Sequence, residues 1–350
     1  MHGWRRSPFF GTCWIGSGRA APPPLSGPEP AAKKGPALTV LSASALALLG
    51  LTGATQVLAA RREARAAKLT PPTGQDVEVA GRRVHVEVLG ATGPDLVLIH
   101  GSSGNIRDFT HRLAPELATR YRVFVVDRPG LGWSDPLPGG GSLVEQATAI
   151  QAAVAALGAT RPLVLGHSYG GAVALAWGAT RPGTLAGIVH LSGVAYPWDT
   201  GLGAYYTLLS HPLGLALVIP LITAFTPGPV IRAEIGKVFA PQEPPSGYIA
   251  HFGPDMAVRR GQMRANARQR RRLLAEIAAL SPGWAGIGVP IEVVHGDRDE
   301  IVSQHIHAER LAAEHPDARL TILPGIGHAP HHTAMPEVIA AVDRLSLRAM

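Results

Sequence analysis

Beyond residue 70 the chain alternates short apolar runs with longer amphipathic stretches. Residues 77–88 place valine at every second position, with Gly81 between two such runs, and this pattern predicts a β-hairpin. Residues 95–99 form a continuous apolar run, as expected of a strand buried on both faces of a parallel sheet. A helical stretch follows at 108–119. Strand and helix patterns then recur at 123–126 with 143–157, 163–165 with 172–180, and 291–294 with 303–314, together with strands at 188–191 and 320–323 and a closing helix at 336–345.

This alternation predicts an α/β fold with a mainly parallel central sheet that is covered by helices on both faces. One interval interrupts it, because residues 192–290 contain helical patterns and no strand pattern. We therefore predict one catalytic domain over 75–350, with an inserted helical cap at about 194–283.

The segment before this domain has two parts. Residues 1–36 are rich in Gly, Pro, Ser and Arg and show no periodicity, so we interpret them as a disordered extension or as a mis-called start region that is not translated. Residues 37–60 carry no charge and are long enough to span a bilayer as a helix. A transmembrane anchor is favoured by length, while a cleaved signal peptide or a buried core helix stays open.

Charges on either side of residues 37–60 bear on orientation. Lys33 and Lys34 precede the segment, and Arg61, Arg62 and two further cations follow it. The positive-inside rule then favours a cytoplasmic catalytic domain, and export after signal cleavage is the alternative.

Composition supports a folded chain with a buried core. Hydrophobic residues make up 46% of the chain and charged residues 16%, which excludes a disordered chain. The net charge of +7 comes largely from local arginine clusters with no interleaved aromatic residues, so we predict no nucleic-acid partner. Cys13 is the only cysteine, which excludes an intrachain disulfide and a multi-cysteine metal site.

The strongest local signal is the sequence Gly166-His167-Ser168-Tyr169-Gly170. It follows the predicted strand at 163–165 and opens an Ala-rich helical stretch, which is the setting that the G-x-S-x-G nucleophile elbow requires. Glycine neighbours allow the sharp turn that presents a serine at the carboxyl end of a strand. Ser168 is therefore the candidate nucleophile.

A serine hydroxyl needs a base to remove its proton and a carboxylate to orient that base. His328 lies in the loop after the last predicted strand, and Asp299 lies in the loop after the strand before it. His331 and His332 are alternatives to His328, and Asp297, which we expect to shape its turn, is the alternative to Asp299. We expect His100, His167 and His190, which lie near strand ends, to be structural.

Residues 100–104, His-Gly-Ser-Ser-Gly, follow the strand at 95–99. This loop can aim a backbone N–H at a substrate carbonyl oxygen. We predict an oxyanion hole made by the N–H groups of Ser102 and Tyr169, and a plain tight turn is the alternative.

Together these motifs, in this order, resemble the α/β-hydrolase fold family over the region from about residue 75 to the end. The stretch 127–135, Asp-Arg-Pro-Gly-Leu-Gly-Trp-Ser-Asp, resembles the family's D-x-P-G-x-G-x-S turn, which is structural there. The resemblance implies a Ser-His-Asp hydrolase without cofactor or metal. It leaves acyltransferases, carbon–carbon bond hydrolases and cofactor-free haloperoxidases open, as well as a non-catalytic binding protein. Dehalogenases and epoxide hydrolases of the family place Asp where Ser168 stands.

Cap composition points to the substrate class. Residues 202–225 are almost uncharged and rich in Leu, Ile and Tyr, which suits a hydrophobic ester or acyl substrate, simple packing on the core, or membrane contact. Arg260, Arg264, Arg268 and Arg272 share one helical face, as a solvated face or as a surface for anionic lipid headgroups. We expect a carboxylesterase-like enzyme that acts on a hydrophobic small molecule.

Overall fold

The computed structural model describes residues 27, 36–199, 201 and 203–349, which belong to two units, 1–50 and 51–350. In the first unit, residues 36–50 are helical and form the beginning of α1 (Pro36–Leu69). Apart from residues 27 and 36, the segment 1–36 that we interpreted as disordered or untranslated lies outside the described residues. The second unit holds the rest of α1 and all of the elements that follow.

Eight strands of the described residues form one sheet in the order β1-β2-β4-β3-β5-β6-β7-β8. The hairpin strands β1 and β2 are antiparallel to their neighbours, and β3 to β8 run parallel to one another, so the predicted mainly parallel sheet is confirmed. The strands are β1 (Gln75–Val79), β2 (Arg82–Leu89), β3 (Asp95–Ile99), β4 (Arg122–Val126), β5 (Leu163–His167), β6 (Gly187–Leu191), β7 (Ile291–Gly296) and β8 (Ala318–Leu323).

Strand order reverses beside β3. The chain moves outward from β3 to β4 and then crosses back, so that β5 lies on the other side of β3 with Ile99 opposite Gly166. Loops that leave a parallel sheet on opposite sides of such a point diverge and open a crevice at the carboxyl ends of the strands. The loop after β3 and the turn after β5 therefore line the two sides of the same crevice.

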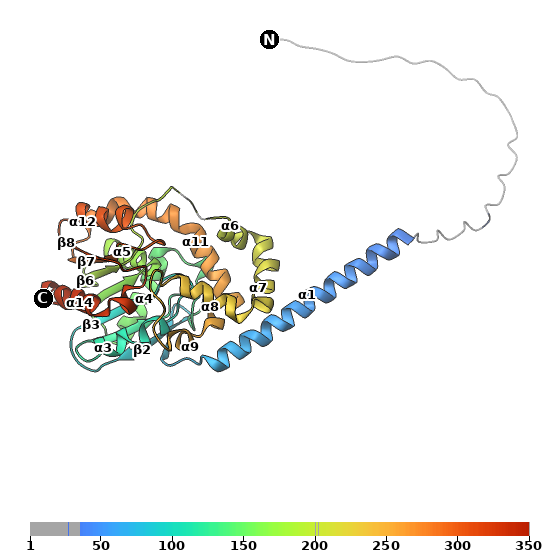
Figure 1. Ribbon diagram of the computed structural model, residues 1–350, viewed down its shortest axis with the longest axis horizontal. Helices are drawn as coiled ribbons and strands as arrows, with labels where there is room; N and C mark the ends of the chain where they lie inside the picture. Colours follow the sequence, from blue (N-terminus) through green and yellow to red (C-terminus); the bar gives the residue numbers. More distant parts are fainter. Residues whose placement is uncertain (1–26, 28–35, 200, 202, 350) are drawn as a thin grey trace, which may run out of the picture. The chain divides into compact units, whose positions relative to one another are not determined.

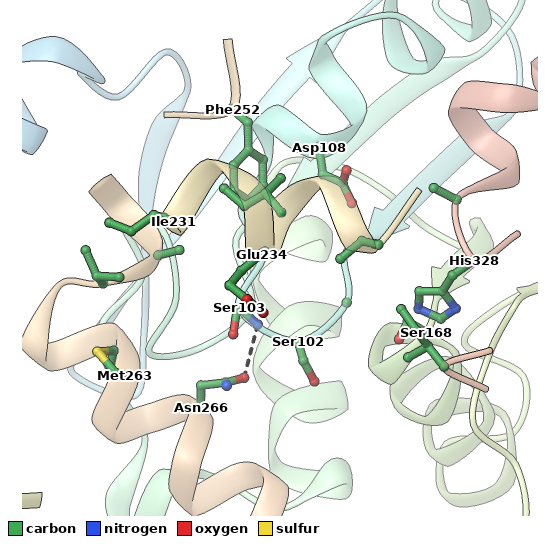
Figure 2. Close-up of a pocket in the computed structure, with 18 of the residues that line it drawn as sticks. Ser102, Ser103, Asp108, Ser168, Ile231, Glu234, Phe252, Met263, Asn266 and His328 are labelled. Carbon is green, nitrogen blue, oxygen red and sulfur yellow. Dashed lines mark hydrogen bonds between the residues drawn. The ribbon is translucent and has the colours of Figure 1, made fainter. Parts of the chain in front are cut away.

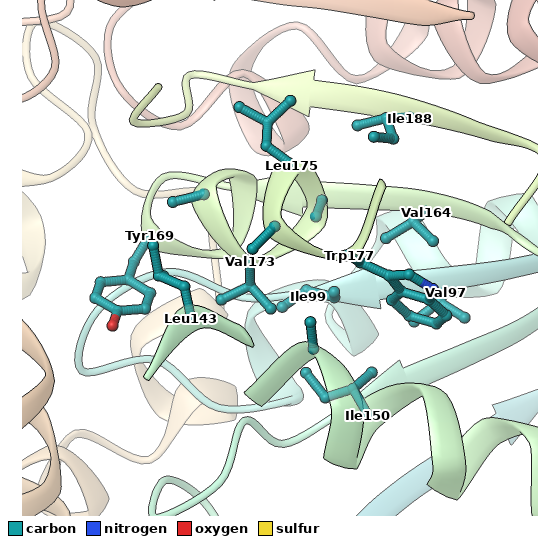
Figure 3. Packing of buried hydrophobic residues seen from close by; sticks show 14 of the residues in the cluster. Val97, Ile99, Leu143, Ile150, Val164, Tyr169, Val173, Leu175, Trp177 and Ile188 are labelled. Carbon is teal, nitrogen blue, oxygen red and sulfur yellow. The ribbon is translucent and has the colours of Figure 1, made fainter. Parts of the chain in front are cut away.

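Helices cover both faces of the sheet (Figure 1). Strand residues that point to either face are apolar, so each face is buried by a layer of helices. On one face Val97 and Val164 pack with residues of α4 (Leu143–Ala156) and α5 (Tyr169–Thr180), as Figure 3 shows. On the other face Leu96 and Leu98 pack with α3 (Leu113–Leu117) and the closing helix α14 (Met335–Ala349).

Two of the predicted helices are divided. The stretch at 108–119 forms α2 (Arg107–Thr110) and α3, because Pro115 has no N–H to donate to residue 111 and Arg112 leaves helical geometry with φ −147°. The stretch at 303–314 forms a π-helical segment η4 (His305–Glu309) followed by α12 (Arg310–Glu314). The remaining short helical segments of the domain core are η1 (Pro138–Gly140) and α13 (Pro330–Thr333).

The interval between β6 and β7 is a helical insertion, as predicted, and lies on one side of the domain in Figure 1. Its elements are α6 (Gly203–Ser210), η2 (Gly214–Val218), α7 (Ile219–Phe225), α8 (Gly228–Lys237), α9 (Tyr248–Phe252), α10 (Pro254–Ala257), α11 (Arg260–Leu280) and η3 (Ser281–Gly286). Leu209, Ile219, Met263 and Ala267 form a small core between the first of these helices and α11.

No single helix of the described residues has both the length and the apolar character needed to cross a bilayer. The two segments Gly203–Ser210 and Gly214–Phe225 meet these requirements only when they are taken together, and they meet at an angle of 88°.

A buried carboxylate ties the closing helix to the sheet. Glu292 on β7 is fully buried, and its oxygens lie 3.0 Å from Arg344 Nη2 and 2.6 Å from Arg348 Nη1 on α14. A buried charge is stable only while its partners stay in place. These ion pairs therefore fix the position of α14 across the end of the sheet.

Replacing Glu292 by alanine should lower the free energy of unfolding by about 3 kcal/mol, because two partly buried arginines lose their counter-ion. Urea unfolding followed by circular dichroism measures this loss. The matched control is Glu309→Ala, since Glu309 is 43% exposed and pairs with an exposed histidine. Its loss should stay below about 0.5 kcal/mol. Equal losses in the two variants would contradict the role given to Glu292.

Candidate active site

Ser168 stands alone between the end of β5 and the start of α5, with φ 55° and ψ −118°. Such a positive φ is rare for serine and marks a strained turn. A Cβ atom at Gly166 would lie 2.2 Å from the carbonyl oxygen of Gly170, and one at Gly170 would lie 2.1 Å from that of Ile99. Glycine is therefore required at both positions, and the turn has the geometry of a nucleophile elbow.

His328 and Asp299 meet beside this turn. His328 Nδ1 lies 2.7 Å from Asp299 Oδ2, and both side chains are almost fully buried. Figure 2 shows Ser168 next to the imidazole of His328. The structure thus brings together the three side chains that the sequence selected, each at the carboxyl end of a different strand.

Asp299 is held in its ionised form. Its Oδ1 accepts hydrogen bonds from the N–H groups of Ile301 and Val302, both at 2.9 Å. Burial opposes ionisation, but hydrogen bonds from His295 and His328 keep the pKa of Asp299 well below its ordinary value. A fixed negative charge at this position selects the tautomer of His328 that carries its proton on Nδ1 and leaves Nε2 free to accept one.

The alternatives to these two residues lie elsewhere. Asp297 is exposed, and its Oδ1 accepts the N–H of Gly325 at 2.6 Å, so it connects two loops and shapes the turn. His331 and His332 face the carboxylate of Asp108, at 3.3 and 3.1 Å. Asp299 and His328 form the only pair of these candidates that meets next to Ser168 in the part of the chain that the structure describes.

The predicted oxyanion donors lie on the two sides of the crevice. Ser102 lines the pocket in the loop after β3, and Tyr169 is the first residue of α5. Neither backbone N–H donates to an acceptor among the described residues. The neighbouring N–H of Ser103 is taken by Asn266 Oδ1 at 3.0 Å. This arrangement leaves two N–H groups available for a developing negative charge.

A cavity of about 720 Å³ lies above these groups and beneath the cap. Ser168 and His328 lie at one end of it, and Ile231 and Met263 line it from the cap (Figure 2). Apolar and aromatic side chains of the cap supply much of the remaining lining, and they include Tyr205, Tyr206, Leu209, Ile222, Val230, Phe239 and Phe252. The pocket therefore suits a largely apolar molecule with one polar group at the reacting end.

Known proteins resemble this chain in sequence and in fold. Residues 96–342, more than two thirds of the chain, match the model of the alpha/beta hydrolase family. The chain belongs to this family. It is 28% identical to haloalkane dehalogenase 2 of Mycobacterium tuberculosis over 268 residues, which cover 74% of this chain and 90% of the relative.

Solved structures show the same alpha/beta hydrolase fold. An alpha/beta hydrolase fold protein from Burkholderia ambifaria superimposes with a TM-score of 0.63 at 25% identity, covering 77% of this chain and 96% of that one. A bacterial membrane phospholipase A superimposes with a TM-score of 0.60 at 21% identity, covering 88% and 98%. At these identities the likeness concerns the fold.

A buried arginine contacts both sides of the predicted oxyanion hole. Arg128 is completely buried, and its guanidinium donates to the carbonyl oxygens of His100 at 2.9 Å and Gly101 at 3.1 Å. The same group lies 4.2 Å from the ring centroid of Tyr169 and donates to Gln146 and Gln269. Burial lowers the pKa of Arg128 to about 10, so it stays charged at neutral pH.

The histidines near the strand ends have packing roles. His100 accepts a hydrogen bond from the backbone N–H of Arg128 at 3.0 Å, and burial lowers its pKa to about 3. His167 donates from Nε2 to the carbonyl oxygen of His328 at 2.8 Å and so supports the loop of the base. His190 is fully buried against Gly171 and Gly193. None of the three contacts Ser168 by a hydrogen bond among the described residues.

Behind His328 lies a second polar cluster around Asp108. Tyr248 donates its hydroxyl to Asp108 Oδ1 at 2.7 Å, and His332 Nε2 lies 3.1 Å from the same oxygen. Although burial opposes ionisation, His331 and His332 hold the pKa of Asp108 well below its ordinary value. Asp108 is therefore a buried anion that connects the cap, through Tyr248, to the loop that carries His328.

These residues are also the ones that could hold a metal ion, because ligand atoms of Asp108, His331 and His332 lie within 4.8 Å of one another. Metal-bound histidines usually donate their second ring N–H to a fixed acceptor. Nδ1 of His331 and Nδ1 of His332 have no partner among the described residues. The cluster fits a hydrogen-bonded network better than a metal centre, and the expectation of no metal stays a prediction.

Sequence reasoning passed over three of these groups. Arg128 stands within the Asp-Arg-Pro-Gly turn that we interpreted as structural. The motif does not show that its side chain contacts both the loop after β3 and the ring of Tyr169. His295 stands two residues before Asp297, in the stretch that we searched only for carboxylates. Asp108 carried no signal, because its partners come from residues 248, 331 and 332.

Asp299→Asn should remove a pH-dependent part of the stability. A carboxylate whose folded pKa lies below the unfolded value of about 3.9 stabilises the fold above that value, and this contribution is lost as the pH falls through the folded pKa. The difference between wild type and variant should be on the order of 2 kcal/mol at pH 7 and should shrink below about pH 4. Urea unfolding between pH 7 and pH 3 measures it.

The control for this prediction is Asp297→Asn, which changes an exposed carboxylate two residues away. Its effect on the free energy of unfolding at pH 7 should be below about 1 kcal/mol. If the stability difference between wild type and Asp299→Asn did not change with pH, or if Asp297→Asn showed the larger pH effect, the stabilising carboxylate would not be Asp299.

Proposed function

We propose that this alpha/beta hydrolase is a serine hydrolase that cleaves an ester, or a related acyl bond, of a hydrophobic small molecule. The observation that carries the proposal is the 2.7 Å hydrogen bond between His328 and Asp299 beside Ser168 on its strained turn. A carboxylate nucleophile, which the dehalogenases of the family have at this position, is replaced here by a hydroxyl. Ser168 is therefore assigned to acyl chemistry.

In the proposed reaction Ser168 Oγ attacks the substrate carbonyl carbon while His328 Nε2 takes the hydroxyl proton. Asp299 stabilises the imidazolium that forms. The negative charge on the carbonyl oxygen is met by the N–H groups of Ser102 and Tyr169. Collapse of the tetrahedral intermediate expels the alcohol, which receives the proton from His328, and leaves an acyl group on Ser168.

Water then completes the reaction by the same steps in reverse. His328 removes a proton from the water, the hydroxide attacks the acyl carbon, and Ser168 leaves with its proton restored. Every catalytic group in these reaction steps belongs to the chain, so the proposed mechanism uses no cofactor and no metal. The apolar lining of the cavity supports a hydrophobic acyl or alcohol part.

We also infer that residues 37–60 attach the protein to a membrane. The inference is supported by the absence of charge from these residues and by the cations on both sides of them, which favour a cytoplasmic catalytic domain.

Ser168→Ala should abolish labelling by a fluorophosphonate probe, because the probe reacts only with a serine that an adjacent base activates. His328→Ala should reduce labelling by at least about 100-fold. Gel fluorescence after a fixed time with purified full-length protein measures both. Ser134→Ala is the matched control, since Ser134 is a buried serine whose hydroxyl donates to the carbonyl oxygen of Asp127. Wild-type protein that stays unlabelled would remove the catalytic assignment.

Full-length protein expressed in cells should stay in the membrane pellet through a carbonate wash, because a helix buried in hydrocarbon is not released by high pH or salt. Immunoblotting of pellet and supernatant measures this. A shortened product in the medium or periplasm indicates that 37–60 is a cleaved signal peptide, and release of intact protein by carbonate would contradict the anchor.

A further inference from the structure

The beginning of the cap exposes an apolar stripe. We call residues 203–225, which form α6, η2 and α7, the cap limb. Along it Leu213, Leu217, Leu221 and Phe225 follow one another at intervals of four, which places them on one side of the helical segment. These four side chains are 47–62% exposed, and Tyr205 and Leu208 on α6 are 53% and 52% exposed.

The other side of the cap limb is already packed. Leu209 and Ile219 are buried against Met263 and Ala267 of α11, with Ile222 at the edge of the same cluster. The limb is thus apolar on two sides, and only the inner side has a partner in the described part of the chain. A helix that is apolar all round belongs in a core or in a membrane interface.

Arginines of α11 reach the backbone of the limb. Arg264 donates from Nε to the carbonyl oxygen of Leu215 at 3.1 Å, and Arg271 donates to that of Ser210 at 3.4 Å. No carboxylate lies within ion-pairing distance of Arg264, Arg268 or Arg271 among the described residues, whereas Arg260 and Arg272 on the same helix pair with Glu63 and Glu276. Between Asp199 and Glu234 the chain has no acidic residue, and from Arg259 to Arg272 it has seven arginines and no acid.

An apolar stripe next to unpaired cations suits binding to an anionic bilayer. The leucines would be buried at the acyl boundary, and the arginines would pair with phosphate headgroups. A second protein chain would have to present an apolar groove and acidic side chains together. Charge and apolarity thus favour lipid over a second copy of this chain, which has net charge +7.

Part of α1 reinforces this surface. Arg62 on α1 donates to the carbonyl oxygens of Thr223 and Thr226 at the end of the limb, at 3.2 and 2.6 Å, and Glu63 pairs with Arg260. Thr55 and Ala59 are buried, whereas Leu51 and Val57, on the same stretch of helix, are 62% and 51% exposed. These contacts hold this part of α1 beside the cap, so the exposed side chains of Leu51 and Val57 add to those of the limb.

We propose that the outer side of the cap limb is a docking surface for an anionic phospholipid bilayer. Tyr205, Leu209 and Ile222 of the limb also line the cavity above Ser168. Docking therefore brings a wall of the substrate cavity against the lipid surface. Resting on the function proposed above, this assigns the substrate to amphipathic esters that are dissolved in the membrane, with the limb as the boundary between bilayer and cavity.

Site-specific fluorescence tests the surface in the full-length protein. In a Cys13→Ser background, Leu217→Cys is labelled with the environment-sensitive dye NBD, and the matched control is Leu347→Cys on α14, an equally apolar residue that is 73% exposed. Vesicles are phosphatidylcholine with one quarter phosphatidylglycerol. We expect NBD emission at position 217 to rise at least about two-fold, to shift to shorter wavelength and to be quenched by acyl-brominated lipid, with no change at 347.

A second comparison tests the arginines. Replacing Arg268 and Arg271 together by glutamine should weaken the response at position 217 and bring it close to that seen with phosphatidylcholine alone. An arginine near an anionic membrane surface contributes roughly 1 kcal/mol to the binding free energy, which corresponds to about five-fold in affinity per residue.

Three results would overturn the proposal. The first is water-like emission at 217 while the protein is bound to the vesicles through its N-terminal segment. The second is a concentration-dependent shift at 217 without vesicles, which assigns the surface to a second copy of the chain. The third is an equal response with phosphatidylcholine alone. None of these readouts depends on catalysis, and hydrolysis of a soluble nitrophenyl ester is measured separately, so failure of docking and failure of the proposed chemistry are distinguishable.

Discussion

The parallel pairing of β3 with β5, which brings their carboxyl ends side by side, is the constraint on which the site depends. Pairing of Ile99 with Gly166 brings the loop after β3 against the turn after β5. The backbones approach so closely that a Cβ at Gly170 would touch the carbonyl oxygen of Ile99, and one at Gly101 would lie 3.0 Å from Ser168 Cβ. The candidate nucleophile and the predicted oxyanion donors are thus positioned by backbone geometry, which leaves the neighbouring side chains free to determine the substrate.

Such a turn is costly, since a serine at positive φ stores on the order of 1–3 kcal/mol. The cost is offset by the packing of α5, whose residues from Tyr169 to Gly178 are all buried, with Trp177 and Val173 in the core shown in Figure 3. Arg128 adds a second restraint because it binds the loop after β3 and lies over the ring of Tyr169. A strained turn at the junction of two rigid elements cannot relax without disturbing both.

The sheet and the three candidate catalytic residues were predictable because their signals are local. An apolar run marks each strand, and the residue types that follow it at 168, 299 and 328 are those that acyl chemistry needs. Helix α5 begins at Tyr169, three residues before the predicted start at 172. The earlier start has a local reason too, because a candidate nucleophile at a helix N-terminus is followed directly by the first helical residue. Arg128 and Asp108 were not predictable in this way, because their partners are separated from them by up to 224 residues. The cavity was not predictable for the same reason.

Helix α11 connects the site to the cap limb, and this connection explains why the two should be considered together. Asn266 on α11 binds the N–H of Ser103, and Gln269 accepts from Arg128 while donating to Pro129. Arg264, on the same helix, binds the carbonyl oxygen of Leu215 in the limb. A movement of α11 that loosened the limb would also displace acceptors of the buried arginine, which cannot find water in a closed core. Helix α11 therefore carries hydrogen bonds to the loop after β3 and to Arg128, as well as a hydrogen bond that keeps the limb against the domain.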